Sequence, residues 1–383
     1  MSDASAAPRL RIGVLRLTDA APVILAQEFG FFADEGIESE LLVEPSWANI
    51  ADKLAHGFLD AAAIMPPLAF ALSAGLRGPA VPLTVPAALS LGGNTITFSR
   101  AWADKVKARQ GSDGPAVALA SLLRETGEPL PLGVTHGFST HHLLLRYWLA
   151  AAGIDPDRDV KLTVVPPAGA VEALQTGRIA GFCAGAPWGE VAARAKQGQS
   201  VASSRDIWAL APEKIFAVHA GWAARHPTAT AGAVRALVRA GQFCDAPENA
   251  SYTGAVLSRR RYLNVDSHAI LSSLPGGAIA AANPSFFFRH AATFPFRSHA
   301  LWFLHQMRRW NLIPDGAVAA AAAIYRPELY RAAVAPLGID LPRADQKCEG
   351  AHAAAWLLDA DPNPIAMTAD RFCDGQIFDP GPA

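Results

Sequence analysis

Apolar and polar positions follow the same pattern in two parts of the chain. Residues 10–14 (LRIGV) read as a strand, and Thr18-Asp19-Ala20-Ala21-Pro22 carries the polar residue and the proline that are typical of a helix start. Residues 130–134 (LPLGV) repeat the strand about 120 positions later and lead to Ser139 and Thr140, either of which can cap a helix. Each half is therefore predicted to begin with a strand, a loop and a helix.

The match between the halves continues in register. Gly57 and Pro67 in the first half correspond to Gly177 and Pro187 in the second, and each pair marks a helix that ends at the glycine and an apolar strand that stops at the proline. This predicts β-α-β-α-β twice. Such alternation is typical of an α/β fold with parallel sheets covered by helices, here in two lobes that face a cleft.

The same pattern predicts how the chain is divided. We expect residues 10–96 to form the first part of lobe 1, residues 97–216 to form lobe 2, and residues 217–340 to return to lobe 1 as mostly helical chain. Residues 341–383 are expected to be an irregular tail. The clearest helices of the returning part are predicted at residues 229–242, 298–310 and 316–325.

Composition narrows the class of protein. The 383 residues carry 33 Lys and Arg against 34 Asp and Glu, and 51% of them are hydrophobic. A near-neutral chain without a basic block is not expected to bind nucleic acid or an anionic membrane through its charge, and the apolar content argues against disorder. The longest apolar stretch, residues 61–75, contains two prolines and is shorter than the roughly 20 residues that a membrane helix needs. We expect no membrane span.

The amino-terminal residues and the cysteines bear on the compartment. Residues 1–10 contain Asp3 and no apolar run, so they do not resemble a secretory signal, and a cytoplasmic protein is expected. The cysteines lie far apart without a C-x-x-C pair, so we expect them to be reduced and to bind no metal. They are Cys183, Cys244, Cys348 and Cys373.

In open α/β sheets ligands bind beyond the carboxyl ends of the strands, which places residues 45–47, 91–95, 137–142 and 183–188 at the cleft. In the third of these loops, the first turn of a helix offers free N–H groups to an anion, and His141 adds a ring donor. His141 and His142 differ by about 100° around the helix, so one is expected to face the cleft while the other packs or meets solvent. Two histidines without function would show the same pattern.

Three further candidates each have an ordinary alternative. Asn94, after two glycines, can donate an amide hydrogen bond to a ligand, but Gly-Gly-Asn is also common turn chemistry. Lys214 can place a positive charge in the cleft, although most lysines are solvated. Trp47 can form a wall of the cleft or belong to the core.

Several short segments follow one another in a specific order between residues 10 and 312, although no single tripeptide among them is specific. They are Leu17-Thr18-Asp19-Ala20-Ala21-Pro22, Ser46-Trp47, Thr140-His141-His142, Arg146-Tyr147-Trp148-Leu149-Ala150, Gly153-Ile154-Asp155-Pro156, Val164-Val165-Pro166-Pro167, Pro187-Trp188 and Pro212-Glu213-Lys214. In this combination the chain resembles the nitrate-binding protein family. That family includes receptors of nitrate and bicarbonate ABC transporters and a cytoplasmic sensor of the NasS type.

The resemblance implies a type II periplasmic-binding-protein fold, in which two α/β lobes close on an anion. It assigns the nitrate contacts to Trp47, Asn94, His141 and Lys214, with Asn94 standing where the family's transport receptors have glutamine. In the bicarbonate-binding relatives an acidic side chain replaces the lysine and a calcium ion helps to hold the ligand. Lys214 therefore implies nitrate or nitrite, without a metal and without a cofactor.

The chemistry of nitrate is consistent with this set. Nitrate is a planar monoanion with weakly basic oxygens, so its burial requires several donors and one balancing charge. Lys214 offers the charge, Asn94 and His141 offer hydrogen bonds, and Trp47 offers an apolar wall or an indole N–H. If His141 is protonated when ligand is bound, affinity is expected to rise toward acid pH. No nucleophile or general base is required, and we expect no enzyme.

The expected compartment favours the sensor among these relatives. Such a sensor is implied to hold an RNA-binding antiterminator of the NasT type when it is empty, and to release it when nitrate or nitrite binds, which switches on nitrate assimilation. Three alternatives stay open: the solute receptor of a nitrate ABC transporter, a binding protein for a larger organic ligand such as a sulfonate or a pyrimidine, and an enzyme similar to thiamine-pyrimidine synthases. The scattered cysteines do not provide the clustered cysteine motif of such enzymes.

Overall fold

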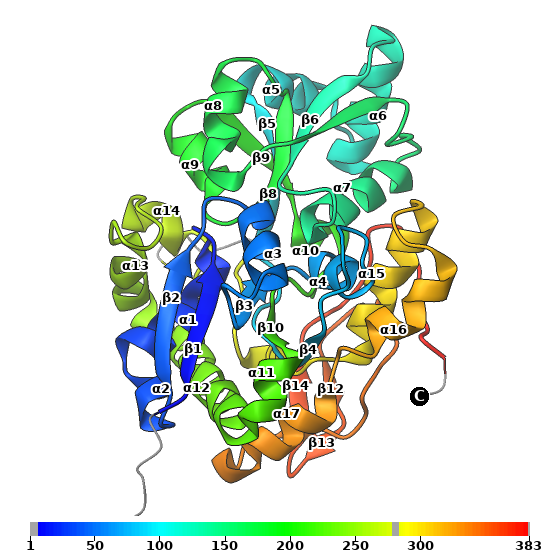
Figure 1. Ribbon diagram of the computed structural model, residues 1–383. Coiled ribbons are helices and arrows are strands. Elements are labelled where there is room, and N and C mark those ends of the chain that lie inside the picture. The colour runs from blue at the N-terminus through cyan, green and yellow to red at the C-terminus, as the bar shows by residue number, and fades with distance from the viewer. Residues whose placement is uncertain (1–6, 278–282, 382–383) are drawn as a thin grey trace, which may run out of the picture.

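Two α/β lobes make up the protein, one above the other in Figure 1. The computed structural model describes residues 7–277 and 283–381. The predicted alternation of strands and helices is present in both lobes, and each lobe is built on one five-stranded sheet. Within the described ranges, no helix has both the length and the apolar character needed to cross a bilayer.

Both sheets are mixed, whereas the sequence pattern predicted parallel ones. The sheet of lobe 1 has the strand order β2-β1-β3-β10-β4, and β10 runs antiparallel to both of its neighbours. The sheet of lobe 2 has the order β7-β6-β8-β5-β9, in which β5 is the antiparallel strand. The strands are β1 Arg9–Val14, β2 Glu38–Val43, β3 Ala61–Ile64, β4 Leu83–Ala88, β5 Asn94–Ser99, β6 Leu130–Val134, β7 Val160–Val164, β8 Gly181–Gly185, β9 Gly198–Ser203 and β10 Ile215–His219.

The antiparallel strands β5 and β10 are the ones that the chain enters as it passes from one lobe to the other. The two crossings, residues 89–93 and 210–214, run side by side: Leu89 N donates to Lys214 O at 2.8 Å, and Gly92 N donates to Ala211 O at 2.8 Å. The expected boundaries after residues 96 and 216 therefore fall inside β5 and β10, and the crossings precede them. The two crossings therefore run antiparallel, with Lys214 opposite Leu89 and Ala211 opposite Gly92.

Gly92 is required at its place in the first crossing. Its φ is +77°, and a Cβ atom there would lie 2.9 Å from the backbone oxygen of Pro284. A left-handed backbone with a close neighbour is a conformation that only glycine adopts without strain. Gly92 therefore allows the returning chain near residue 284 to pack against the first crossing.

Helices cover both sheets. Lobe 1 begins with α1 Ala21–Glu28, α2 Phe31–Asp34, α3 Trp47–Ala55 and α4 Pro66–Ser73, and lobe 2 contains α5 Arg100–Arg109, α6 Gly114–Thr126, α7 Thr140–Ala151, α8 Ala170–Gln175, α9 Trp188–Arg194 and α10 Ser204–Ile207. The returning chain forms α11 Ala220–Arg225, α12 Pro227–Asp245, α13 Ala250–Ser258, α14 Ser267–Leu271, α15 Arg297–Arg309, α16 Val318–Ala322 and α17 Pro327–Val334. The predicted helix at residues 229–242 lies within α12, and the one at residues 298–310 coincides with α15 to within one residue, whereas the alanine-rich one is shorter than expected.

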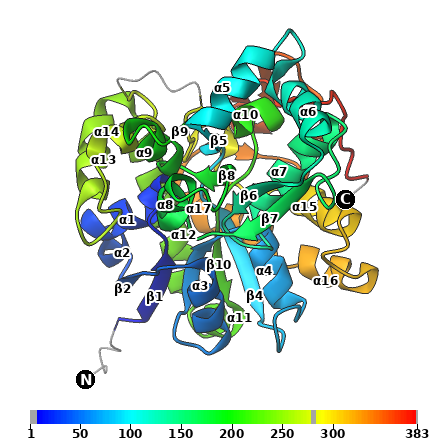
Figure 2. The same ribbon diagram turned by 90° about the horizontal axis from the view of Figure 1, so that it is seen from above.

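The returning chain contacts lobe 2 as well as lobe 1. Helix α14 packs against α9, and α15 packs against both α7 and α4. Figures 1 and 2 place α14 on one side of the junction between the lobes and α15 on the other. The helices that complete lobe 1 therefore flank the junction.

The tail is more ordered than the sequence indicated. It contains two antiparallel strand pairs, β11 Leu341–Pro342 with β13 Ala360–Asp361, and β12 Trp356–Leu358 with β14 Ile365–Met367. Beyond them Phe372 forms a β-bridge with Trp208 and stacks on Trp302 of α15, with ring centroids 5.6 Å apart and planes at 13°. Tyr147 of α7 donates a hydrogen bond to Asp374 at 2.9 Å. The tail therefore joins α7 of lobe 2, the residue that follows α10 just before the second crossing, and α15.

We expect Phe372→Ala to lower the free energy of unfolding by about 3–5 kcal/mol, because it leaves a cavity among packed rings. Leu357→Ala is the control, since this side chain on β12 is 68% exposed and its loss should cost under about 0.5 kcal/mol. Urea unfolding measures both. Equal, small losses would show that the packing of the tail does not stabilise the protein.

Candidate functional site

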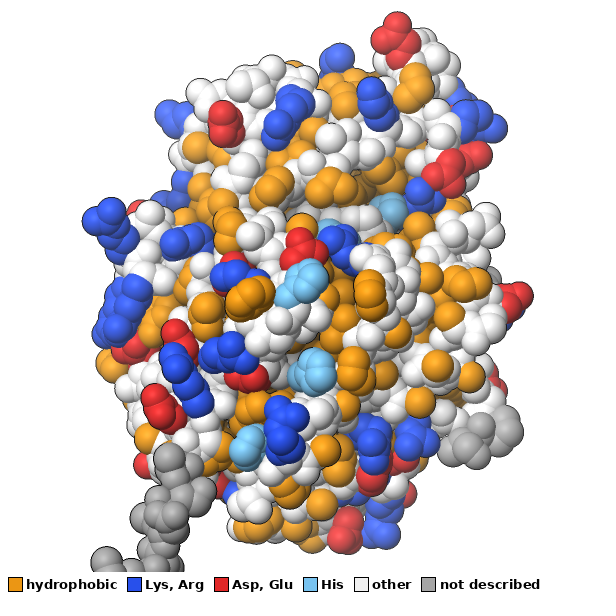
Figure 3. Space-filling view, viewed as in Figure 1, with side chains coloured by type: hydrophobic (Ala, Val, Ile, Leu, Met, Phe, Trp, Pro, Cys, Tyr) orange, Lys and Arg blue, Asp and Glu red, His pale blue; other side chains and the backbone are white. Residues whose placement is uncertain are grey.

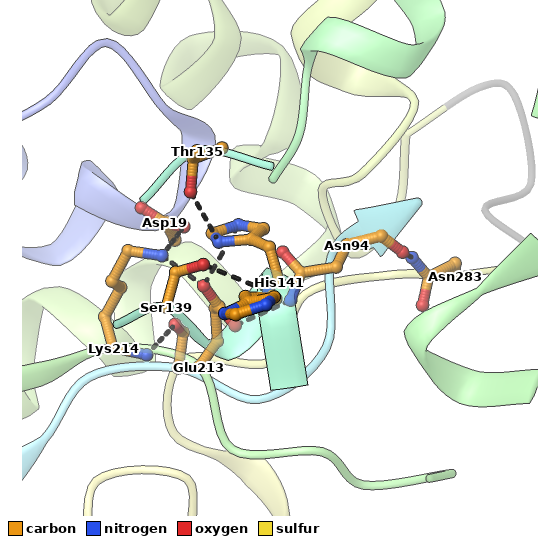
Figure 4. A network of polar contacts seen from close by, with 10 residues as sticks. Asp19, Asn94, Thr135, Ser139, His141, Glu213, Lys214 and Asn283 are labelled. Carbon is orange, nitrogen blue, oxygen red and sulfur yellow. Dashed lines mark hydrogen bonds and ion pairs between the residues drawn. The ribbon is translucent and has the colours of Figure 1, made fainter. Parts of the chain in front are cut away.

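The four residues expected at the cleft come together at the junction of the lobes (Figure 4 shows Asn94, His141 and Lys214). Trp47 is the first residue of α3, whose cap Ser46 accepts a hydrogen bond from Asn49 N at 3.2 Å. His141 lies in the first turn of α7, which Ser139 caps in the same way. Asn94 begins β5, and Lys214 directly precedes β10. The crossings and two helix starts therefore bring distant segments to one point.

The Lys214 ammonium is held between two carboxylates. Its Nζ lies 2.8 Å from Asp19 Oδ2, donates to Glu213, and lies 5.2 Å from the centre of the Trp47 ring. The side chain is 1% exposed. Burial lowers the pKa of Lys214, but the charges of Asp19 and Glu213 and their hydrogen bonds outweigh burial, so its pKa stays above the usual value. Lys214 is a buried cation, not the solvated lysine of the alternative interpretation.

Asp19 and Glu213 are site residues that the sequence analysis did not assign. Burial raises the pKa of Asp19 to about 6, an effect that Lys214 opposes and the charge of Glu213 reinforces. Both lay within segments noted in the sequence, Asp19 in a helix start and Glu213 next to Lys214. A lysine that is to be buried needs an acidic partner, and this was the available signal.

Asn94 uses part of its amide group within the protein. Its Nδ2 donates one of its two N–H groups to Glu213 Oε2 at 2.6 Å. Its Oδ1 is buried without a hydrogen-bond partner among the described residues. Asn94 therefore has a second amide N–H as well as an acceptor, and its role as a donor to a ligand stays a prediction.

Of the two neighbouring histidines, His141 faces the cluster, as expected for one of the pair. Its Nδ1 lies 3.0 Å from Thr135 Oγ1, and its Nε2 lies 3.4 Å from Glu213 Oε1. Burial, aided by the charge of Lys214, holds the pKa of His141 well below its usual value, so the ring is neutral. His142 turns away and accepts a hydrogen bond from Arg146 Nε at 2.7 Å.

Several buried polar atoms on these segments have no hydrogen-bond partner in the part of the chain that the structure describes. They are Thr18 Oγ1, Trp47 Nε1, Asn94 Oδ1, Thr140 Oγ1 and His141 Nε2. Leaving such groups unpaired costs about 1–3 kcal/mol each. These five atoms are therefore the candidates for hydrogen bonds to a small polar ligand at the junction.

The site is enclosed by both lobes. Thr18 N of lobe 1 donates to Ala186 O of lobe 2 at 2.8 Å, and Trp188 Nε1 donates to Arg16 O at 3.1 Å. Figure 3, which has the same viewpoint as Figure 1, shows the upper and the lower lobe in contact on this face of the molecule. Because Lys214 and His141 are buried, a ligand reaches them only when the lobes separate.

Comparisons with known proteins show which family the chain belongs to. The sequence profile described as NMT1-like family matches residues 3–258. The chain belongs to this family. It is 32% identical over 399 residues to the nitrate/nitrite binding protein NrtA of Synechococcus elongatus, covering 99% of this chain and 85% of that protein.

Two other relatives add to this. The chain is 38% identical over 308 residues to the bicarbonate transport ATP-binding protein CmpC of Synechococcus elongatus, and the match covers 80% of this chain but only 46% of that protein. The crystal structure of the periplasmic nitrate-binding protein NrtA from Synechocystis PCC 6803 superposes with a TM-score of 0.83 at 27% identity, covering 97% of this chain and 95% of that one. The periplasmic-binding-protein fold expected for this NMT1-like chain is thereby confirmed.

We expect Lys214→Met to destabilise the protein by about 3–5 kcal/mol at pH 8, because it leaves two buried carboxylates without a counter-charge. The deficit should shrink at pH 5, below the pKa of about 6 of Asp19, because a protonated Asp19 no longer needs the ammonium. Urea unfolding at the two pH values measures this.

Lys161→Met, at an exposed position of β7, is the matched control and should change little at either pH. A Lys214 deficit that is the same at pH 5 and pH 8 would contradict the pairing with Asp19.

Proposed function

We propose that this protein binds nitrate or nitrite between its lobes. The observation that carries the proposal is the Lys214 ammonium, which is buried at the lobe junction 5.2 Å from the Trp47 ring and accompanied by unpaired polar atoms on the same segments. An ammonium with three donors can serve both carboxylates and still offer one N–H to an anion. Support also comes from the similarity to NrtA over nearly the whole chain.

Hydrogencarbonate is the second candidate, and one observation favours it. Asn94 Oδ1 is a buried acceptor without a partner among the described residues. It faces Gly185, since a methyl group on this glycine would lie 3.4 Å from it. Nitrate has no proton to donate to an acceptor, whereas hydrogencarbonate carries an O–H. The 38% identity to CmpC is consistent with this candidate. Lys214, as the balancing charge, makes nitrate or nitrite the first choice.

We further propose that binding has a regulatory output rather than a catalytic one. In this proposal the empty protein holds an RNA-binding antiterminator of the NasT type in the cytoplasm and releases it when the anion closes the lobes. Support comes from the enclosed site, because a ligand that binds only the closed arrangement shifts the population toward it. The solute receptor of a nitrate ABC transporter is the alternative, and it would use the same closure to signal to a permease.

A ligand panel tests the binding step. Calorimetry with nitrate, nitrite, hydrogencarbonate and an alkanesulfonate should give the tightest binding for nitrate or nitrite. Gly185→Ala should weaken that binding at least tenfold, since its methyl group would lie 3.3 Å from Asp19 Oδ2 and 3.4 Å from His141 Nε2, inside the cluster.

Gly137→Ala, in the loop before α7, has open space around the added methyl group and should bind like the unmodified protein. Tightest binding of hydrogencarbonate would favour the second candidate. Unchanged nitrate affinity in Gly185→Ala would show that nitrate does not bind at this cluster.

The regulatory step is tested by mixing the protein with a NasT-type antiterminator and following complex size by gel filtration. Nitrate should dissociate the complex of the unmodified protein and of Lys161→Ala. Lys214→Ala should keep its partner in nitrate, because the ligand site is lost while the open form survives. A complex that Lys214→Ala still releases on addition of nitrate would defeat the assignment.

A further inference from the structure

The buried cluster carries more negative than positive charge before any ligand is counted. Asp19 and Glu213 are both buried carboxylates, and Lys214 is the cation between them. The imidazole ring of His141, which also lies at the cluster, is kept neutral by burial and by the charge of Lys214. With both carboxylates ionised, the cluster has a net charge of minus one. An anion that enters it adds a second negative charge in a site shielded from water, where such repulsion is strongest.

A proton on one of the cluster's own groups would remove this repulsion, and the contacts indicate which group accepts it. Glu213 accepts a hydrogen bond from Asn94 Nδ2 at 2.6 Å and another from Lys214. Among the residues that the structure describes, Asp19 has Lys214 alone as an ion-pair partner, at 2.8 Å. Two donors therefore hold the Glu213 carboxylate and one holds that of Asp19, which points to Asp19 as the carboxylate that accepts the proton.

The other groups that face Asp19 do not compete for the proton. Asp19 and His141 both face Gly185, since a Cβ on this glycine would lie 3.3 Å from Asp19 Oδ2 and 3.4 Å from His141 Nε2, and burial keeps the ring of His141 neutral. Cys183, on the same strand, is buried, and burial with the charge of Glu213 raises the pKa of its thiol, which stays protonated throughout. Burial places the pKa of Asp19 at about 6, close enough to neutrality for a nearby anion to complete its protonation.

We infer that the protein takes up one proton on the Asp19 carboxyl when it binds a monovalent oxyanion, so that the net charge of the buried cluster is conserved. This inference rests on the proposed function. It makes Asp19 a residue that determines specificity: one proton balances one ligand charge, so a dianion such as sulfate is left uncompensated and is excluded. It also couples affinity to pH.

The sign of the pH dependence follows from linkage. Below the pKa of Asp19 in the ligand-free protein the proton is already bound, so affinity is independent of pH. Above it the proton must be taken from solvent, and affinity falls by up to tenfold for each pH unit. With a ligand-free pKa of about 6, the loss between pH 6 and pH 8 is at most about fifty-fold.

Nitrate binding measured by calorimetry at pH 6 and pH 8, in two buffers of different ionisation enthalpy, tests this inference. We expect close to one proton taken up per nitrate at pH 8 and weaker binding there than at pH 6. Asp19→Asn, which keeps the size of the side chain and removes its charge, should bind nitrate without proton uptake and with the same affinity at both pH values. Asp52→Asn, at an exposed carboxylate of α3, should behave like the unmodified protein.

The outcomes separate this inference from the function on which it rests. Nitrate binding without proton uptake, or an Asp19→Asn variant that keeps the pH dependence, would overturn the inference and leave the binding function standing. A folded Asp19→Asn variant that binds nitrate at neither pH would also overturn it, since Asp19 would then serve to hold Lys214. Failure of nitrate, nitrite and hydrogencarbonate alike to bind the unmodified protein would reject both.

Discussion

The buried ion pair between Lys214 and Asp19, with Glu213 as the second carboxylate, is the interaction on which the rest of the site depends. A lysine that is 1% exposed is tolerated only with acidic partners at hydrogen-bond distance. Those partners come from a helix start in lobe 1 and from the crossing itself. The charge that makes the site attractive to an anion is therefore tied to the pairing of the two crossings, and the site is as rigid as that pairing.

Glu213 connects this charge to lobe 2. Its carboxylate accepts from Asn94 at the start of β5 and lies 3.4 Å from His141 in the first turn of α7. When the lobes separate, these contacts must loosen, and the water that enters weakens every charge interaction in the cluster. In the mechanism proposed above, ligand binding, lobe closure and the protonation of Asp19 belong to one equilibrium. The tail, which packs Phe372 against Trp208 and Trp302, is attached close to the same crossing.

The near-neutral overall charge has a consequence for selectivity. A chain with 33 basic and 34 acidic residues has no general positive field that would attract anions. Selection of an anion depends on the local arrangement, which includes two acids as well as one base. In the proposed function that arrangement discriminates by charge balance and by hydrogen-bond direction, and the unpaired acceptor Asn94 Oδ1 bears on the choice between nitrate and hydrogencarbonate.

The sequence by itself determined the α/β alternation and the two-lobe repeat, because periodicity, caps and strand ends are local properties of the chain. The set Trp47, Asn94, His141 and Lys214 came from the resemblance to a family, since local patterns left an ordinary alternative for each residue. The sequence did not reveal the antiparallel strands β5 and β10, the ordered tail, the roles of Asp19 and Glu213, or the direction in which Asn94 points. Those depend on contacts between residues far apart in sequence, such as Asn94 with Glu213 and Lys214 with Asp19. Only the tertiary structure decides them, since a buried charge takes its partner from whatever the fold brings within hydrogen-bond distance.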